Sequence, residues 1–187
     1  MSKHVSLGYK LATLSAHNPS EPAPVAAMNS KPFSVDNPLP LEDSCVYLLA
    51  VATNVNSSTW QRRYAQGYRM TLTDWRVLMM LVSRRGLCAT ELSDILAIDK
   101  MNITRSVKRL LAFKRIKAST NPMDRRRLDL TVTSKGATIY NDVAPSAWRH
   151  QERLLQDLSP AEQLMLRELL GKVLATGRRL ASEPPAP

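Results

Sequence analysis

Two short segments of alternating side chains, joined by a loop, most constrain what this 187-residue chain can fold into. Polar and less polar residues alternate over 116–120 and again over 128–133, which is typical of β-strands with one buried face. The loop between them, 121–127, opens with the turn-forming pair Asn-Pro and contains three consecutive arginines. The pattern predicts a small β-hairpin whose tip carries three adjacent positive charges.

Apolar residues at helical spacing predict four helices before the hairpin. The first is long, and the other three are short and separated by tight turns. A Ser, Thr or Asp side chain that precedes a helix accepts hydrogen bonds from its first free backbone N–H groups, so it marks the start. The predicted helices are 41–68, ending near Gly67; 74–84, capped by Thr73 and stopped by Gly86; a short helix capped by Thr90; and 100–113, capped by Asp99.

Two further helices are predicted after the hairpin. Thr133 starts the first, which runs to about Leu158 with a bend at Pro145. The second covers 160–180, because Ser159-Pro160-Ala161-Glu162 combines an N-cap serine, a proline at the first helical position and an acid at the third.

These elements predict a mainly α fold with a small β-hairpin wing. Residues 1–40 hold six of the twelve prolines and show no sustained periodicity, so we expect a disordered arm there. The rest divides into a folded domain and a frayed tail. The expected ranges are 41–181 for the domain, 182–187 for the tail, about 72–133 for a winged helix-turn-helix made of three short helices and the hairpin, and about 41–68 and 134–181 for the helices from both ends.

The positive charge of the chain is concentrated in one segment. The formal net charge is +10, and residues 100–127 alone carry ten Lys or Arg against one acid, Asp124. A dense cationic patch favours polyanionic partners through long-range attraction and counterion release. The distribution indicates a binding surface and not a general solubility device.

A winged helix places the third helix of its trio in the DNA major groove and the hairpin tip beside it. Asn102 suits an adenine edge, and Arg105 or Arg109 suits guanine. Arginines at the tip suit a narrow minor groove, where negative potential is enhanced, and the remaining polar residues suit phosphates. The predicted DNA-binding residues are Lys100, Asn102, Thr104, Arg105, Ser106, Lys108, Arg109, Lys117, Arg125, Arg126 and Arg127.

Asp124, just before the arginines, has two interpretations that both stay open. Its carboxylate can pair with Arg126 or Arg127 and stabilise the wing. Alternatively, it can form an Asx-type turn next to Pro122.

Three stretches resemble the MarR family of bacterial transcription regulators: LTDWRVLMML (72–81), ATELSDILAIDKMNITRSVKRLLAFKRI (89–116) and NPMDRRRLDLTVTSKG (121–136). The resemblance covers about residues 41–181. It implies an obligate homodimer built from dimerisation helices at both ends, about 41–68 and 134–181. It also implies a pseudo-palindromic duplex operator, repression as the commoner mode, and release by a small effector. The family's wing arginine corresponds to Arg126. Arg127 stands where the family more often has a small residue, and we expect it to add a phosphate contact.

The resemblance also implies an effector cleft between the dimerisation helices and the DNA-binding part, often used for aromatic or phenolic acids. Aromatic walls with a nearby cation suit a planar carboxylate, so we expect an aromatic or heteroaromatic acid. Core packing for Trp75, interface packing for Tyr47 and Trp60, and plain solvation for the charged residues are the competing interpretations. The candidate effector-binding residues are Tyr47, Trp60, Arg63, Tyr64, Trp75, Arg76 and His150.

Cys45 offers a different signal, thiol oxidation. It lies near the position where a peroxide-sensing branch of the resembled family keeps a reactive cysteine. That branch has a tyrosine one helical turn later, where this chain has Leu49. A cysteine flanked by apolar residues is expected to be a small buried hydrophobe.

The sequence has few features typical of enzymes, metalloproteins or membrane proteins. It contains no His-Glu-x-x-His, nucleophile elbow, glycine-rich phosphate loop or Cys-x-x-Cys, so we expect no enzyme, cofactor or metal. No apolar run reaches the roughly 18 residues that span a bilayer. The cytoplasm, with nucleoid association when DNA is bound, is the expected location. A non-catalytic winged-helix interaction module remains an alternative, although it would not require so concentrated a charge.

Overall fold

The computed structural model describes residues 34–36, 38, 40, 41 and 44–184, so most of the predicted arm lies outside the described residues. The chain forms two compact units, 1–50 and 51–187. In the first unit, the backbone N–H of Tyr47 donates to Ser44 Oγ at 3.3 Å, and this contact supports the start of α1 (Cys45–Trp60). The helix then continues into the second unit.

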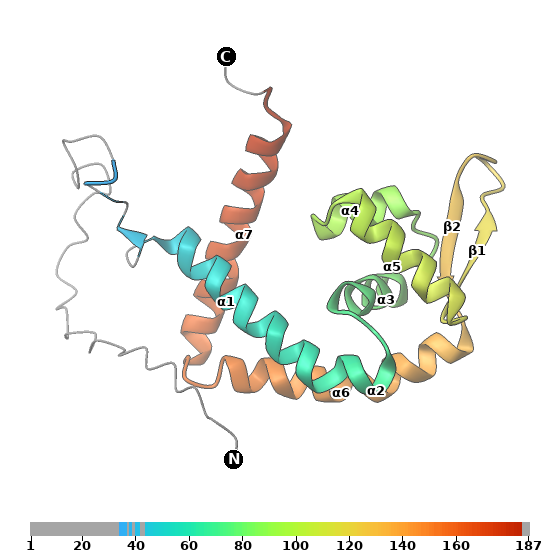
Figure 1. Ribbon diagram of the computed structural model, residues 1–187, viewed down its shortest axis with the longest axis horizontal. Coiled ribbons are helices and arrows are strands. Elements are labelled where there is room, and N and C mark those ends of the chain that lie inside the picture. The colour runs from blue at the N-terminus through green and yellow to red at the C-terminus, as the bar shows by residue number, and fades with distance from the viewer. Residues whose placement is uncertain (1–33, 37, 39, 42–43, 185–187) are drawn as a thin grey trace. The chain divides into compact units, whose positions relative to one another are not determined.

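The second unit is mainly helical with one hairpin, which confirms the predicted fold class (Figure 1). The chain stays helical after α1 as far as Tyr68, close to the predicted end at Gly67. The elements that follow α1 are η3 (Gln61–Ala65), which is a π-helix, α2 (Gln66–Tyr68), α3 (Leu72–Ser83), α4 (Ala89–Leu96), α5 (Lys100–Ala112), β1 (Ile116–Thr120), β2 (Leu128–Val132), α6 (Ser134–Leu154) and α7 (Pro160–Ser182).

Two helices begin earlier than the sequence predicts, because an acid at the third helical position completes the cap. Thr71 Oγ1 accepts the N–H of Asp74 at 3.2 Å, and the Asp74 carboxylate accepts the N–H of Thr71 at 2.8 Å. In the same way Glu91 accepts the N–H of Cys88 at 2.8 Å before α4. Such reciprocal caps satisfy two otherwise unpaired donors at once. The predicted caps Thr73 and Thr90 are therefore wrong, and the predicted caps Asp99, Thr133 and Ser159 are confirmed.

The core of the second unit is built around α3, which contacts α4, α5, α6 and β2. Its apolar face is fully covered at Val77 and Leu78. Each such side chain stabilises the fold by about 1.5–3 kcal/mol relative to exposure. The buried apolar residues shared with the neighbouring elements are Trp75, Leu81, Leu92, Ile103, Val107, Leu110, Ile116, Leu130 and Val143.

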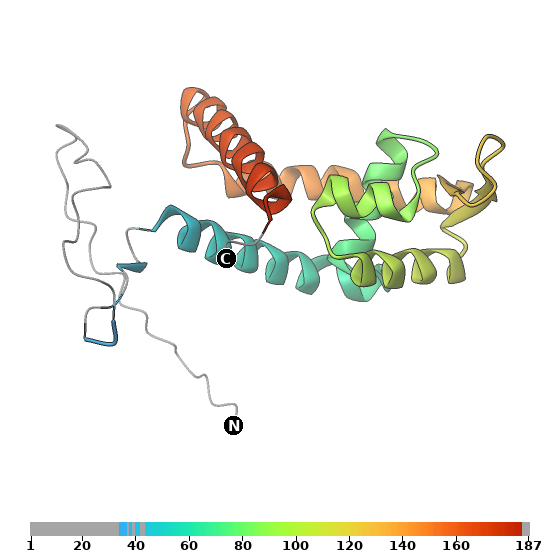
Figure 2. The ribbon, with the colours of Figure 1, turned by 90° about the horizontal axis from the view of Figure 1, so that it is seen from above.

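The hairpin has the predicted strands and is tied to the helices at its base. β1 and β2 pair antiparallel, from Ile116 opposite Val132 to Thr120 opposite Leu128. Leu130 also pairs with Leu87 in the turn between α3 and α4. Both views place the hairpin beside the C-terminal end of α5 (Figures 1 and 2). The wing is thus anchored to the same helices that position α5.

Gly136 lets α6 approach the base of the wing. A Cβ at this position would lie 2.0 Å from the carbonyl oxygen of Arg115, which no side chain tolerates. Thr133 fixes the approach, because its backbone N–H donates to the same carbonyl at 3.0 Å. The threonine and glycine of the 121–136 segment therefore have a packing role.

The last two helices are long, and α7 lacks a covered face. α6 continues through Pro145 and ends at Leu154, four residues before the predicted end. α7 has 23 residues and none of them is buried. Its exposed large apolar residues are Leu164, Met165, Leu166, Leu169, Leu170, Val173, Leu174 and Leu180. None of the helices in the described ranges combines the length and the apolar character needed to cross a membrane.

Candidate nucleic-acid interface and ligand cavity

The outward face of α5 carries five of the eleven side chains predicted to bind DNA. Ile103, Val107 and Leu110 point into the core, and the opposite face is left to polar residues. Thr104 Oγ1 donates to the Lys100 carbonyl within the helix at 2.7 Å. The exposed residues of this helix are Lys100, Met101, Asn102, Thr104, Arg105, Lys108 and Ala112, and Lys117 is exposed on β1.

Asn102 lies at the start of this face and is partly occupied by the helix cap. Its side-chain amide and its backbone N–H both donate to the carboxylate of Asp99, the backbone contact at 2.9 Å. The backbone hydrogen bond, and then the amide hydrogen bond, lower the pKa of Asp99 because both favour its charged form. The cap fixes the direction of the Asn102 side chain before any partner binds.

Ser106 does not belong to the outward face, which corrects the prediction. It has no solvent exposure and lies with the core residues of α5. Its hydroxyl finds no hydrogen-bond partner among the described residues. A serine is small enough to enter a core, so its polarity misled the assignment of faces. A phosphate contact by Ser106 is excluded by this burial.

Arg109 points back to α3 and pairs with a buried carboxylate, so its predicted contact with guanine is also corrected. Its Nε lies 2.7 Å from Asp74 Oδ2, and a terminal nitrogen donates to Oδ1 at 3.0 Å. Asp74 has no exposed side-chain surface, whereas Arg109 is 37% exposed. The hydrogen bond to Asp74 raises the pKa of Arg109. Asp74 needs this cation, because an unpaired buried charge is costly.

At the wing tip, Arg125 and Arg126 are exposed, and Asp124 shapes the turn. Asp124 Oδ1 accepts the backbone N–H of Arg126 at 3.0 Å. The side-chain oxygen of Asn121, Oδ1, accepts the backbone N–H groups of Met123 and Asp124 at 2.8 and 3.1 Å. These are Asx-type contacts, so Asp124 holds the loop through the backbone.

Arg127 turns away from the tip and faces the helices, contrary to the predicted phosphate contact. Its guanidinium reaches Asp129 Oδ1 at 2.8 Å and the two carboxylate oxygens of Glu91 at 3.0 and 2.9 Å. It also donates to the carbonyl of Gly86 at 2.8 Å. The hydrogen bond to Asp129 raises the pKa of Arg127, with further support from Glu91. These partners engage the cation from the protein side, while 33% of the Arg127 side chain stays exposed.

Arg115 is a third inward arginine, and no sequence pattern predicted it. It is 5% exposed and donates to the backbone carbonyls of Tyr68 and Arg69. Its guanidinium carbon lies 4.9 Å from the centre of the Phe113 ring, close enough for a cation–π contact. Burial lowers the pKa of Arg115. This side chain ties the end of α2 to the base of the wing.

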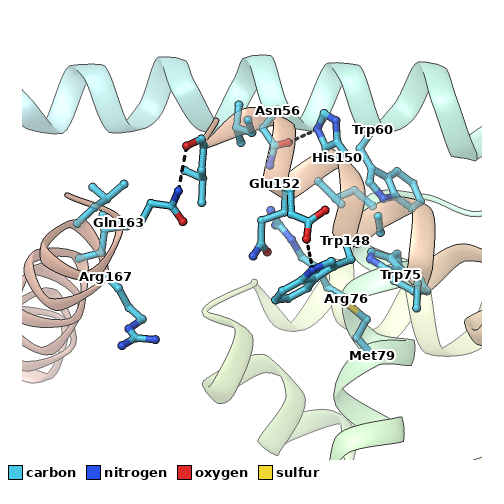
Figure 3. Close-up of a pocket in the computed structure, with 18 of the residues that line it drawn as sticks. Asn56, Trp60, Trp75, Arg76, Met79, Trp148, His150, Glu152, Gln163 and Arg167 are labelled. Carbon is cyan, nitrogen blue, oxygen red and sulfur yellow. Dashed lines mark hydrogen bonds between the residues drawn. The ribbon is translucent and has the colours of Figure 1, made fainter. Parts of the chain in front are cut away.

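A cavity of about 1070 Å³ lies between α3, α6, α7 and the second half of α1. Figure 3 shows Trp75, Arg76 and Trp148 on one side and Gln163 and Arg167 on the other. Four predicted effector residues line it, namely Trp60, Trp75, Arg76 and His150. The walls therefore combine aromatic rings with two arginines and with one carboxylate, Glu152, which accepts a hydrogen bond from Trp148 Nε1 at 2.8 Å.

The predicted effector residues have separate local roles. Trp75 is buried and stacks on Tyr140 with ring centres 5.6 Å apart, as its core interpretation requires. His150 Nε2 lies 3.0 Å from Asn56 Oδ1 (Figure 3). The other three predicted residues differ. Tyr47 and Arg63 are exposed and are not among the lining residues, and the side chain of Tyr64 lies outside the described residues.

Cys45 also differs from the expectation. The sequence predicts a buried apolar cysteine, but the thiol is exposed at the start of α1. A first turn has no preceding turn to cover it, so flanking apolar residues do not ensure burial.

The chain is similar to known transcription regulators. No protein-family model matches the chain. It is 31% identical over 113 residues to the multiple antibiotic resistance protein MarR of Salmonella typhimurium, covering 59% of this chain and 78% of that protein. It is 26% identical over 141 residues to the HTH-type transcriptional repressor NicR of Pseudomonas putida, covering 75% and 89%.

One similar solved structure concerns a protein whose DNA binding is regulated by a small acid. The structure of BpsR from Bordetella bronchiseptica, reported for the regulation of its DNA binding by 6-hydroxynicotinic acid, matches with a TM-score of 0.62. The two sequences are 25% identical, and the match covers 68% of this chain and 96% of BpsR. With the helical trio, the wing and the identity to MarR, these matches show that the chain belongs to the MarR family of DNA-binding transcription regulators.

Proposed function

We propose that this protein is a homodimeric repressor that binds a pseudo-palindromic duplex operator and leaves it when a small aromatic or heteroaromatic acid binds. The observation that carries the DNA-binding part is the shared exposure of Arg105 and Lys108 on α5 and of Arg125 and Arg126 at the wing tip. A helix in the major groove with a basic wing beside it needs this arrangement.

Only the predicted residues that are exposed in the structure are proposed to contact DNA. Asn102 and Arg105 read base edges, and Met101, which is 61% exposed, adds an apolar surface for a thymine methyl group. Arg125 and Arg126 enter the minor groove. Lys100, Thr104, Lys108 and Lys117 contact phosphates and position the protein.

The proposed dimer rests on the uncovered apolar face of α7. Its 23 residues include none that is buried, and Leu169, Val173 and Leu174 are about half exposed. A second copy of the chain would cover this face and remove its apolar surface from water. Two-fold symmetry then places two half-sites about 10 bp apart.

The effector proposal rests on the composition of the cavity. Trp148, which is 60% exposed, offers an aromatic ring, and Arg76 and Arg167 offer cations for a carboxylate. A charged hydrogen bond of this kind contributes about 1.5–3 kcal/mol. The repressor NicR and the hydroxynicotinate-regulated BpsR support both the mode of action and the heteroaromatic acid.

The test begins with DNA fragments that the protein retains from its own genome. Binding to the selected duplex is then titrated with 6-hydroxynicotinic acid and a panel of benzoic acids. We expect at least one acid to release the DNA, and Arg76→Gln to weaken that acid about tenfold or more. The matched control Arg84→Gln, at an exposed arginine outside the cavity lining, should respond like wild type. Release by none of the acids would refute the effector proposal while leaving DNA binding intact.

The exposed thiol of Cys45 supports a second candidate, release by oxidation. Thiol reactivity requires access as well as thiolate character. If peroxide releases wild-type protein from DNA and Cys45→Ser abolishes the response, the signal is redox chemistry. An unchanged response of Cys45→Ser would remove this candidate.

A further inference from the structure

We propose that Arg127 is a positioning residue, which holds Arg125 and Arg126 at a fixed offset from α5 and does not itself contact DNA. This inference rests on the proposed function, since it assumes that the wing tip enters a groove. It assigns the third wing arginine a role different from that of its two neighbours.

One guanidinium joins three separate segments of the second unit. Four of its N–H groups are used: one on Asp129 in β2, two on the Glu91 carboxylate in α4, and one on the Gly86 carbonyl before α4. An arginine has five N–H donors in a planar fork, so this site nearly saturates it. The two contacts to Glu91 form a bidentate pair, which fixes orientation as well as distance.

The network continues from Asp129 into the loop. Asn121 Nδ2 donates to Asp129 Oδ2 at 2.7 Å, and Asn121 Oδ1 accepts the backbone N–H of Met123 in the loop at 2.8 Å. The backbone closes it, because Asn121 N–H donates to the Arg127 carbonyl and Arg127 N–H donates to the Asp124 carbonyl, at 2.9 and 3.0 Å. Arg125 and Arg126 lie inside this closed loop, so their backbone is held from both ends.

At the other end, the network reaches the first turn of α4. Glu91 also accepts the backbone N–H of Cys88. That hydrogen bond, together with Arg127, lowers the pKa of the Glu91 carboxyl, which keeps it charged. α4 packs against α5. The position of the wing tip is therefore set relative to the helix proposed to lie in the major groove.

The electrostatics argue against a direct phosphate contact by Arg127. Glu91 and Asp129 both pair with it, so the cluster carries one more negative than positive charge. A phosphate would have to displace two carboxylates to reach the guanidinium. The value of Arg127 for binding is instead pre-organisation, because a wing already in place loses less conformational freedom on binding.

The test is a double-mutant cycle on the selected operator duplex, with affinity measured as a function of salt. The first change is Arg127→Met, the second is Arg125→Ala with Arg126→Ala, and the third combines them. Positioning predicts that Arg127→Met weakens wild-type binding about tenfold, within the range for coupled residues. The salt slope should stay unchanged. In the background without the tip arginines, the same substitution should cost less than twofold.

A direct phosphate contact predicts the opposite pattern. Arg127→Met would then lower the salt slope by about 0.9 and cost the same factor in both backgrounds. Arg127→Lys separates the two ideas further, because lysine keeps the charge but cannot form the bidentate pair. Positioning predicts that Arg127→Lys behaves like Arg127→Met; a lysine variant with wild-type affinity would overturn it.

Two controls keep the result interpretable. Glu91→Gln retains an acceptor for the α4 cap and removes the ion pair, so it should reproduce the loss and add little to Arg127→Met. Melting temperatures of all variants show whether the domain remains folded. If removing Arg125 and Arg126 leaves affinity unchanged, the proposed wing contact fails. If that removal weakens binding but Arg127→Met is additive with it, only the positioning role fails.

Discussion

The ten cations of residues 100–127 divide between two regions with different fates. Seven are exposed on α5, on the hairpin or in the turn between them, and three turn inward against carboxylates or carbonyls. All four lysines are in the exposed set, and the inward set consists only of Arg109, Arg115 and Arg127. The exposed set is Lys100, Arg105, Lys108, Lys114, Lys117, Arg125 and Arg126.

This division follows from the chemistry of the two side chains. Arginine offers a planar fork of donors that can satisfy several acceptors while staying charged, and lysine offers a strongly hydrated point charge. Arg109 binds a buried carboxylate in two places, and Arg115 spans two carbonyls. The cationic segment therefore supplies both the surface proposed to face DNA and three arginines that stabilise the fold. Substitutions in the two sets should therefore fail in different assays.

The largest effect is expected on stability, from Arg109→Met. The change leaves the Asp74 carboxylate buried without its cation, which costs about 3–5 kcal/mol for a buried pair. We expect about 3 kcal/mol, because Arg109 is 37% exposed and water screens part of the interaction. Chemical denaturation at one fixed protomer concentration measures the change, since dimerisation contributes to stability.

Arg105→Met is the matched control, four residues earlier on the same helix. It removes the same charge from an exposed position, so its free energy of unfolding should change by no more than about 0.5 kcal/mol. If Arg109→Met and Arg105→Met lowered the free energy of unfolding equally, the pairing of Arg109 with Asp74 would not stabilise the fold.

The next largest effect is expected on DNA affinity, where Arg105 should matter more than Arg109. Arg105→Ala should weaken binding to the selected operator by about 1–3 kcal/mol and relax the preference at one base position. The reason is that a good bidentate contact to guanine is worth about this much discrimination. Competition binding with operators changed at single positions measures it. Loss of affinity without any change in base preference would make Arg105 a phosphate contact.

At the wing tip, Arg126→Ala should act mainly through counterion release. One lost phosphate-region contact lowers the slope of log affinity against log salt by about 0.9. We also expect a weaker preference for A·T-rich flanks, where a narrow minor groove attracts arginine. The measurement is a salt titration on two duplexes that differ only in those flanks. Unchanged operator affinity would show that the wing assignment is wrong.

The elements themselves were predictable because their signals are local. Strand alternation predicted 116–120 and 128–133, and the observed strands cover 116–120 and 128–132. Asp99, Thr133 and Ser159 each precede the helix that they were predicted to cap. The family resemblance rests on the same stretches. The predicted starts of α3 and α4 were wrong because a threonine near each start, Thr73 or Thr90, looked like the cap. The observed caps are Thr71 and Cys88, each of which has an acid three residues later that completes the cap.

The inward arginines could not be assigned from sequence, because their partners are distant. Asp74 and Arg109 are separated by 35 residues, and Glu91 and Arg127 by 36. Helical spacing places Ser106 and Arg109 on one face with Asn102, yet Ser106 is buried and Arg109 is paired. Spacing gives relative positions around a helix, but only packing decides which arc is covered. The same holds for the cavity, whose Trp148 and Arg167 come from helices far from Arg76 in the chain.

The smallest effect is expected for Lys117→Ala, which tests whether an exposed cation contributes without reading sequence. Lys117 lies exposed on β1, away from the tip of the hairpin. A phosphate contact made by this side chain positions the protein on any duplex, so its loss should weaken cognate and unrelated DNA by the same factor. The ratio of the two affinities should therefore stay at the wild-type value, while the salt slope falls by up to about 0.9. A selective loss of cognate binding would contradict this prediction, because it would mean that Lys117 contacts bases and that β1 lies close to them.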